Sequence, residues 1–144
     1  MESIQVNDKS FVPYLKHEEL QQIVKNLAEK VHEDYKDETP IFIGVLNGVI
    51  MFFSDFMKYY PGKCEIAFIQ MSSYQGTQST GIVYKKMELT KDITNRHIIL
   101  MEDIVDTGNT IESLFEYFKN TQRPKSIKVA TLLMKPDVYS KEFK

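Results

Sequence analysis

Two hydrophobic periods alternate along the chain, one typical of helices and one typical of buried strands. Between His17 and Tyr35 the apolar residues recur every three or four positions, which predicts a helix packed along one face. Residues 49–60 are apolar enough to form a helix packed on the sheet, and a segment that ends near Asn120 repeats the helical spacing. Apolar runs predict buried strands at residues 41–46, 64–71, 98–101 and 127–134. This alternation predicts an α/β fold, a mainly parallel twisted sheet flanked by helices.

Composition places the chain among ordinary globular domains. Its 144 residues are 42% hydrophobic and 26% charged, which suits a single domain spanning residues 1–144. A formal net charge of −2 offers no general attraction to nucleic acid or to anionic membranes. Cys64 is the only cysteine, the N-terminus lacks a signal-peptide core, and the apolar stretch at 41–53 is too short to cross a bilayer. We therefore expect a cytoplasmic protein without nucleic-acid or membrane partners.

The segment from Ile98 to Ile111, which reads IILMEDIVDTGNTI, carries the clearest chemical signal. A buried strand is followed by two acids, Glu102 and Asp103, and then by a loop of small polar residues that opens a helix. The backbone N–H groups of such a loop and the positive end of the helix dipole bind anions. Ligands of open α/β sheets also bind at the carboxyl ends of strands. The layout predicts a site for a phosphorylated ligand. The alternative is that Asp106 or Thr107 serves only as the N-cap of the helix.

The sequence EDIVDTGNT at residues 102–110 resembles the phosphoribosyl-pyrophosphate signature of the type I phosphoribosyltransferases. The resemblance implies the fold of that family and Mg²⁺ as cofactor. Lys135 and the segment around Ser72 favour the branch of the family that acts on 6-oxopurine bases. We therefore expect an enzyme of purine salvage. It would transfer the 5-phosphoribosyl group from phosphoribosyl pyrophosphate to hypoxanthine or guanine, giving IMP or GMP and pyrophosphate.

The same resemblance implies roles for the residues of this segment. Glu102 and Asp103 match the acidic pair that approaches the ribose hydroxyls and the bound Mg²⁺. Asp106 matches the catalytic base that accepts the proton of purine N7 as N9 attacks. The 5-phosphate is expected to bind the hydroxyl and N–H groups of Thr107, Gly108, Asn109 and Thr110. Many relatives carry a lysine at the position of Asn109, so phosphate binding here is expected to rest more on backbone donors.

Two loops are expected to complete the site. Asn47 and Gly48 resemble the family's pyrophosphate loop, in which a non-proline cis peptide often occurs; a plain turn is the alternative. Ser73 and Tyr74 resemble the start of a mobile loop, here about residues 72–86, that closes over the active site and excludes water. A surface loop without this role is the alternative.

Lys135 matches the lysine that donates a hydrogen bond to the purine 6-oxo group. An ammonium cannot accept a hydrogen bond from an amino group, so this lysine would favour hypoxanthine or guanine over adenine. A lysine just past a strand is usually a plain surface residue. This role therefore depends on the rest of the resemblance.

The resemblance is incomplete at the C-terminal end. Members of the family continue for some tens of residues past the position of Lys144, so the fold is expected to lack its C-terminal part. Two alternatives for function stay open. The chain could be a regulatory module that binds phosphoribosyl pyrophosphate without turnover, or a xanthine or pyrimidine phosphoribosyltransferase. Because relatives of this kind pair, a homodimer or homotetramer is expected.

Overall fold

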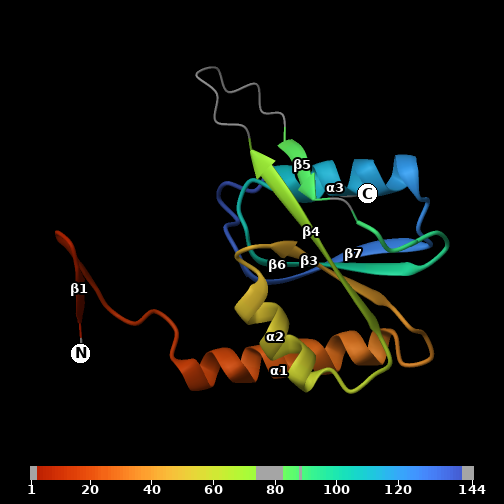
Figure 1. Cartoon of the computed structure of the whole chain (residues 1–144). Helices are drawn as coiled ribbons and strands as arrows, with labels where there is room; N and C mark the ends of the chain where they lie inside the picture. The colour runs from red at the N-terminus through yellow and green to blue at the C-terminus, as the bar shows by residue number, and fades with distance from the viewer. Residues whose placement is uncertain (1–2, 74–82, 88, 141–144) are drawn as a thin grey trace.

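A five-stranded sheet runs through the middle of the molecule (Figure 1). The computed structural model describes residues 3–73, 83–87 and 89–140. The strands of the sheet are β3 (Ile41–Leu46), β4 (Glu65–Ser73), β5 (Val83–Met87), β6 (His97–Val105) and β7 (Ser126–Met134). They lie in the order β5-β4-β3-β6-β7, with β5 antiparallel to β4 at one edge and the other four parallel.

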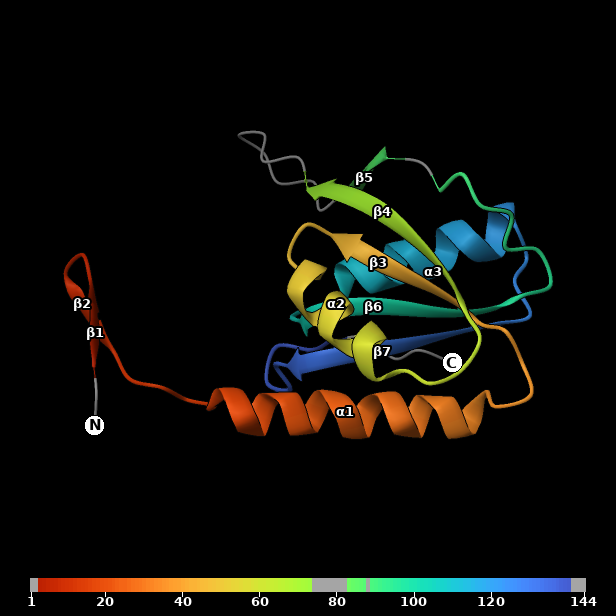
Figure 2. The ribbon, with the colours of Figure 1, turned by 60° about the horizontal axis from the view of Figure 1, so that its bottom comes forward.

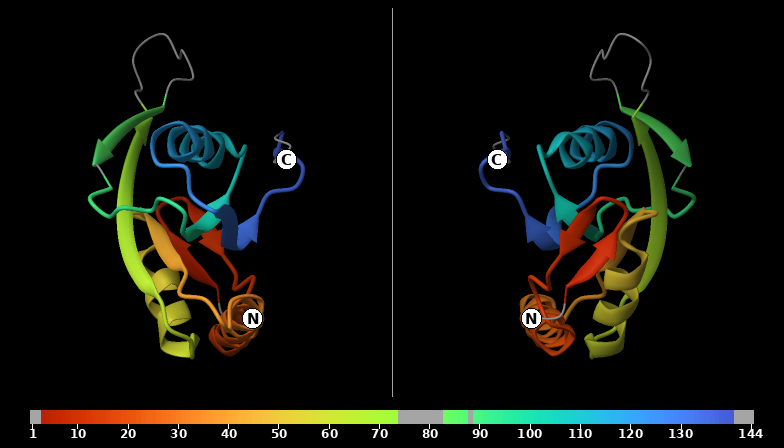
Figure 3. Two further views of the ribbon diagram at one scale, coloured as in Figure 1. Left: turned by 90° about the vertical axis from the view of Figure 1, so that its right-hand side faces the viewer. Right: turned by 90° about the vertical axis from the view of Figure 1, so that its left-hand side faces the viewer.

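Helices cover both faces of this sheet. α1 (His17–Asp34) and α2 (Ile50–Tyr59) pack on one face, and α3 (Asn109–Thr121) packs on the other (Figures 1 and 3). Side chains alternate along β3, so Phe42 joins the core under α1 and α2, whereas Ile43 joins the core under α3. The mainly parallel α/β fold expected from the sequence is therefore confirmed. Within the described residues, no helix has the length and apolar character that crossing a bilayer requires.

The hydrophobic pattern does not predict the hairpin near the N-terminus. β1 (Ile4–Val6) and β2 (Lys9–Phe11) pair in antiparallel fashion around a turn in which Asn7 has a φ of 54°. Asparagine tolerates this left-handed conformation better than most residues. The hairpin extends away from the sheet, and its residues are exposed (Figure 2). Strands of three residues without a buried face leave no periodic signal in the sequence.

Strand β6 is longer than the apolar run that predicts it. The sequence places a strand at residues 98–101 with the acids beyond it, but β6 continues to Val105, so Glu102 and Asp103 lie inside the strand. The cause is continued pairing with β7, in which Glu102 lies opposite Thr131. Backbone hydrogen bonds therefore hold the two acids in place after the apolar run has ended.

The segment expected to form the mobile loop is described only in part. Its two ends pair as strands, with Ser72 opposite Tyr84 and Ser73 opposite Val83. Residues 74–82 lie outside the described residues, and Tyr74 is among them. Closure of this loop over the site stays a prediction.

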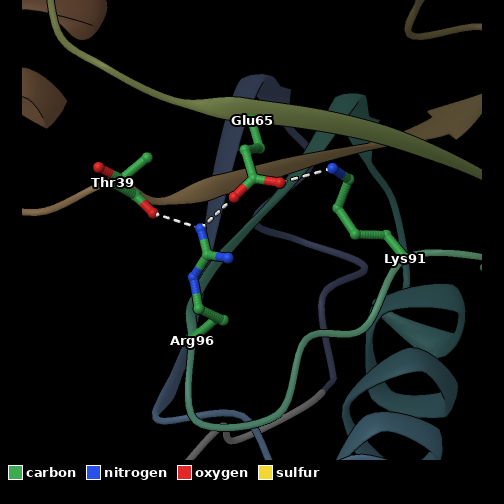
Figure 4. Close-up of polar contacts among 4 residues, drawn as sticks. All are labelled: Thr39, Glu65, Lys91 and Arg96. Carbon is green, nitrogen blue, oxygen red and sulfur yellow. Dashed lines mark hydrogen bonds and ion pairs between the residues drawn. The ribbon is translucent and has the colours of Figure 1, made fainter.

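Polar side chains tie separate segments together at the amino ends of the strands (Figure 4). Glu65, the first residue of β4, accepts hydrogen bonds from Lys91 at 2.6 Å and from Arg96 at 2.5 Å. Arg96 also donates to the carbonyl oxygen of Thr39 at 2.9 Å. We call these four residues the amino-end cluster. It joins the segments that lead into β3, β4 and β6.

Candidate active site

The carboxyl ends of β3, β6 and β7 lie next to one another, and the segments that follow them hold most of the predicted site residues. Asn47 and Gly48 follow β3, residues 106–108 follow β6, and Lys135 follows β7. Because these strands are parallel neighbours, the three segments emerge at the same edge of the sheet. This is the edge at which open α/β sheets bind their ligands.

Gly48 lies directly against Asp103. A Cβ atom added to Gly48 would stand 3.0 Å from Asp103 Oδ2 and 3.1 Å from its Oδ1. Such distances are shorter than most contacts of a Cβ atom, so a side chain at this position would require the Asp103 carboxylate to shift by a few tenths of an ångström. The fold thus brings the predicted pyrophosphate loop into contact with one acid of the predicted ribose and Mg²⁺ site.

The second acid, Glu102, precedes Asp103 in β6 and is half-buried. Burial, and secondarily the negative charge of Asp103, raises the pKa of Glu102 to about 7. Within the described residues, no lysine, arginine or histidine forms an ion pair with either acid. Both carboxyls therefore lie where a bound cation or the donors of a ligand would stabilise their charged forms.

The chemistry of these acids suits Mg²⁺ only in one mode of binding. Carboxylate oxygens are good ligands for this hard cation, which commonly takes one or two carboxylates and completes its shell with water and substrate phosphates. Among the described residues, no group of three or more His, Cys, Asp or Glu side chains is placed to hold a metal ion. The arrangement thus fits a metal shared with a phosphorylated substrate, not one enclosed by the protein alone.

The loop after β6 begins α3 with a glycine. Gly108 is the N-cap residue and has a φ of 88°, in the left-handed region that glycine adopts most readily. The backbone N–H of Asn109 donates to Thr107 Oγ1 at a long 3.4 Å, and Thr110 lies in the first turn of the helix. Because glycine has no side chain, Gly108 supplies no cap to the N–H groups of the first turn, and a helix start of this kind can bind an anion.

This geometry corrects one alternative from the sequence. Asp106 and Thr107 both precede the N-cap, so the interpretation in which one of them serves as the N-cap residue is wrong. The reason is that β6 extends to Val105 and the helix begins only at Asn109, with Gly108 making the turn between them. The Asp106 carboxylate is exposed and turned to another partner.

That partner is Lys135. Its Nζ lies 3.2 Å from Asp106 Oδ2, and both side chains are 54% exposed. The backbone strengthens the juxtaposition: the N–H of Lys135 donates to the carbonyl oxygen of Val105 at 3.0 Å, and the N–H of Ser140 donates to that of Thr107 at 3.4 Å. Residues 135–140 therefore fold back over the loop that opens α3, and the predicted base and the predicted purine donor lie in contact.

The segment after β3 contains a cis peptide bond between Leu46 and Asn47. The sequence expectation placed such a bond near Asn47 and Gly48, and the structure has it at the start of this pair. Asn47 Oδ1 accepts a hydrogen bond from Gln70 Nε2 at 3.4 Å. Gln70 carries no signal of this role in the sequence; it lies opposite Leu46 on β4, three residues before Ser73 at the end of that strand.

An apolar hollow adjoins the loop on the α3 side of the sheet and was also missed by the sequence analysis. Its volume is about 240 Å³, and its lining is Val105, Ile111, Val129, Thr131, Met134 and Tyr139. These residues come from two strands, a helix and the segment after β7. No single stretch of sequence carries a signal for it.

A model of the phosphoribosyl transferase domain family matches residues 13–143. The chain belongs to this family. Among curated phosphoribosyltransferases, hypoxanthine-guanine phosphoribosyltransferase of Streptococcus pneumoniae R6 is 38% identical over 122 residues, which is 84% of this chain and 67% of that protein. The protein of the same name from Staphylococcus epidermidis RP62A is 37% identical over 124 residues, or 85% of this chain and 69% of that protein.

Solved phosphoribosyltransferase structures share the fold. A hypoxanthine-guanine phosphoribosyltransferase of Bacillus anthracis superposes with a TM-score of 0.85 at 32% identity, covering 93% of this chain and 79% of that one. A hypoxanthine phosphoribosyltransferase of Staphylococcus aureus superposes with a TM-score of 0.83 at 33% identity, covering 91% of this chain and 71% of that one. The family assignment made from EDIVDTGNT is confirmed.

Proposed function

We propose that this phosphoribosyltransferase transfers the 5-phosphoribosyl group from phosphoribosyl pyrophosphate to hypoxanthine or guanine, giving IMP or GMP and pyrophosphate. The observation that carries the proposal is the contact between Asp106 and Lys135 beside the uncapped start of α3. A carboxylate and an ammonium meet there, next to the helix start that would bind the 5-phosphate. The names of the relatives support the same purine bases.

Each substrate group has a candidate partner at this edge of the sheet. The 5-phosphate would bind the N–H and hydroxyl groups of residues 107–110, and the pyrophosphate would lie at Asn47 and Gly48. Glu102 and Asp103 would face the ribose, whose ring gains positive charge as the bond to pyrophosphate breaks. Ser73 and Tyr74 would begin the loop that closes over the bound substrates.

Asp106 and Lys135 would act on the base. In the transfer, purine N9 forms a bond to the anomeric carbon, and pyrophosphate leaves with the electron pair of the bond that breaks. The proton on N7 passes to the Asp106 carboxylate, which acts as general base. Lys135 would donate to the 6-oxo group and would thereby select hypoxanthine or guanine.

Mg²⁺, assembly and location belong to the same proposal. Mg²⁺ would bind Glu102 and Asp103 together with the substrate phosphates and would neutralise the leaving pyrophosphate. A homodimer or homotetramer, a cytoplasmic location and the absence of nucleic-acid or membrane partners are proposed from the sequence and the family resemblance.

Pyrophosphate release tests the proposal directly. The purified 1–144 chain would be mixed with Mg²⁺, phosphoribosyl pyrophosphate and hypoxanthine or guanine. Calorimetry would separately measure the binding of phosphoribosyl pyrophosphate without a base. We expect turnover with both bases and its loss in Asp106→Asn. Binding of phosphoribosyl pyrophosphate without turnover would overturn the proposed activity for this chain and favour a regulatory module.

A further inference from the structure

Two lysine–carboxylate pairs of closely similar geometry lie at opposite ends of β7. Lys135 lies 3.2 Å from Asp106 after the strand ends, and Lys125 lies 3.2 Å from Glu38 just before it begins. The side chains of both pairs are about half exposed, 54% and 54% against 50% and 47%. They differ in that Glu38 also lies 3.5 Å from His97 Nε2, and in that only the first pair joins two groups that the proposed reaction assigns to the substrate.

The backbone fixes the Lys135 stem beside Asp106 but leaves its ammonium free to change partners. The main-chain bond from Lys135 to Val105, and that from Ser140 to Thr107, hold this turn against the loop after β6. Beyond its Cα, lysine is a flexible four-carbon stem ending in a compact point charge. A half-exposed ammonium on such a stem can move from a carboxylate to another nearby acceptor without any movement of the backbone.

We propose that the Lys135–Asp106 ion pair competes with the purine, so that only a base with a 6-oxo acceptor draws Lys135 away from Asp106. This inference rests on the proposed function and adds a positioning role to Lys135. A 6-oxo oxygen accepts a hydrogen bond from the Lys135 ammonium, which replaces the bond to Asp106. The Asp106 carboxylate is then free to accept the N7 proton. A 6-amino group offers only donors to Lys135, so the ammonium stays on Asp106.

The size of the competition follows from the exposure of the pair. Half-exposed ion pairs stabilise a protein weakly, so breaking this one should cost at most about a fivefold change in affinity. The ion pair therefore tunes discrimination between bases and does not by itself exclude adenine. Its signature is a coupling between two residues, which a single substitution cannot reveal.

A double-mutant cycle on nucleotide binding measures that coupling. Calorimetry would give the Kd of IMP for the wild type, Asp106→Asn, Lys135→Met and the double variant. Asp106→Asn keeps the shape of the side chain but removes its charge, and so frees Lys135. We expect it to tighten IMP about threefold to fivefold more when Lys135 is present than in the Lys135→Met background.

Two controls isolate the ion pair from general electrostatics. AMP carries the same phosphate but a 6-amino group. Asp106→Asn should therefore change the Kd of AMP by the same factor, to within twofold, with Lys135 and with Lys135→Met. The matched cycle with Glu38→Gln and Lys125→Met breaks the equivalent pair at the other end of β7, and should show no coupling in IMP binding.

The outcomes separate the inference from the function on which it depends. IMP binding without coupling, or equal coupling for IMP and AMP, would overturn the competition while the proposed activity stands. If no protein of the set binds IMP and the wild type releases no pyrophosphate, the proposed function fails and the inference fails with it.

Discussion

Glu65 and Glu102, two acids toward opposite ends of the sheet, have pKa values shifted in opposite directions. At the amino ends, Glu65 contacts Lys91 and Arg96, and their hydrogen bonds, that of Lys91 foremost, hold the pKa of the Glu65 carboxyl below its usual value. At the carboxyl ends, Glu102 is more buried, and burial raises its pKa to about 7. Glu65 is therefore paired with two cationic side chains, whereas Glu102 forms no ion pair within the described residues.

Glu38 extends the same contrast. It accepts from Lys125 at 3.2 Å and lies 3.5 Å from His97 Nε2, and Lys125 is the main cause of the lowered pKa of its carboxyl. Uncompensated charge costs stability unless something binds it. A half-buried carboxyl without a cationic partner, such as Glu102, is therefore a physical sign of a binding site, independent of any motif.

The largest expected effect is that of Asp106→Asn on turnover. Removing a general base while keeping its shape should lower kcat about 100-fold or more, because proton transfer commonly contributes that much. Affinity for phosphoribosyl pyrophosphate should change less than threefold. Steady-state kinetics and calorimetry would check both values, with Glu38→Gln as the control at the amino ends. An equal loss of binding and turnover would show that Asp106 is structural.

The next effect is that of Glu102→Gln on stability. The raised pKa means that the folded protein keeps this proton between pH 4.5 and about 7 while the unfolded chain loses it, so wild-type stability falls across that window. Glutamine stays neutral, so the variant does not lose this stability as the pH rises. We expect the variant to be more stable than the wild type by about 1–3 kcal/mol at pH 8 in urea unfolding, and no more stable at pH 4. A pH-independent difference would contradict the assignment.

Two glycine substitutions compare the ends on equal terms. Gly48→Ala places a Cβ 3.0 Å from Asp103 Oδ2 and should weaken binding of phosphoribosyl pyrophosphate with Mg²⁺ about tenfold by displacing the carboxylate. Gly62→Ala places a Cβ 2.7 Å from His32 Nδ1 near the amino ends. It should lower stability by about 1–3 kcal/mol and leave binding intact. Calorimetry and urea unfolding of both variants would check this, and a reversed pattern would break the comparison.

The smallest effect is expected for Glu65→Gln. Because the pKa of Glu65 is lowered in the folded protein, its charge stabilises the fold above pH 4.5, and this contribution is lost as the pH falls below that value. The variant should therefore be slightly less stable than the wild type at pH 7 and equal to it in acid. Thermal unfolding at both pH values would measure the difference, with Glu29→Gln, at an exposed position of α1, as the control. A larger loss in acid than at pH 7 would refute this account.

Sequence patterns were most informative where they are local. The period of α1 and the apolar run of β3 predict their elements nearly to the residue, because burial on one or both faces fixes the pattern. The acids were placed past β6 and lie inside it, because strand length depends on pairing with β7, which no local pattern records. The family resemblance supplied the candidate site, including Lys135, which periodicity alone would have left as a surface residue.

What the local patterns could not give are the contacts between distant segments. The approach of Gly48 to Asp103, the bond from Gln70 to Asn47 and the hollow beside the loop each join separate strands. Gly48 could be expected to form a turn, but not to lie against a particular carboxylate. Such contacts follow from the order of strands in the sheet, which the sequence specifies only through the whole fold.

The position of Glu102 and Asp103 within β6 has a consequence for the timing of ligand binding. Their backbone is held in the ladder with β7, so it cannot rearrange without breaking strand pairing. The acids are preorganised, and the entropy of ordering them is lost when the protein folds, not when the ligand arrives. Amide hydrogens along this part of β6 should therefore already be protected from exchange with solvent in the free protein.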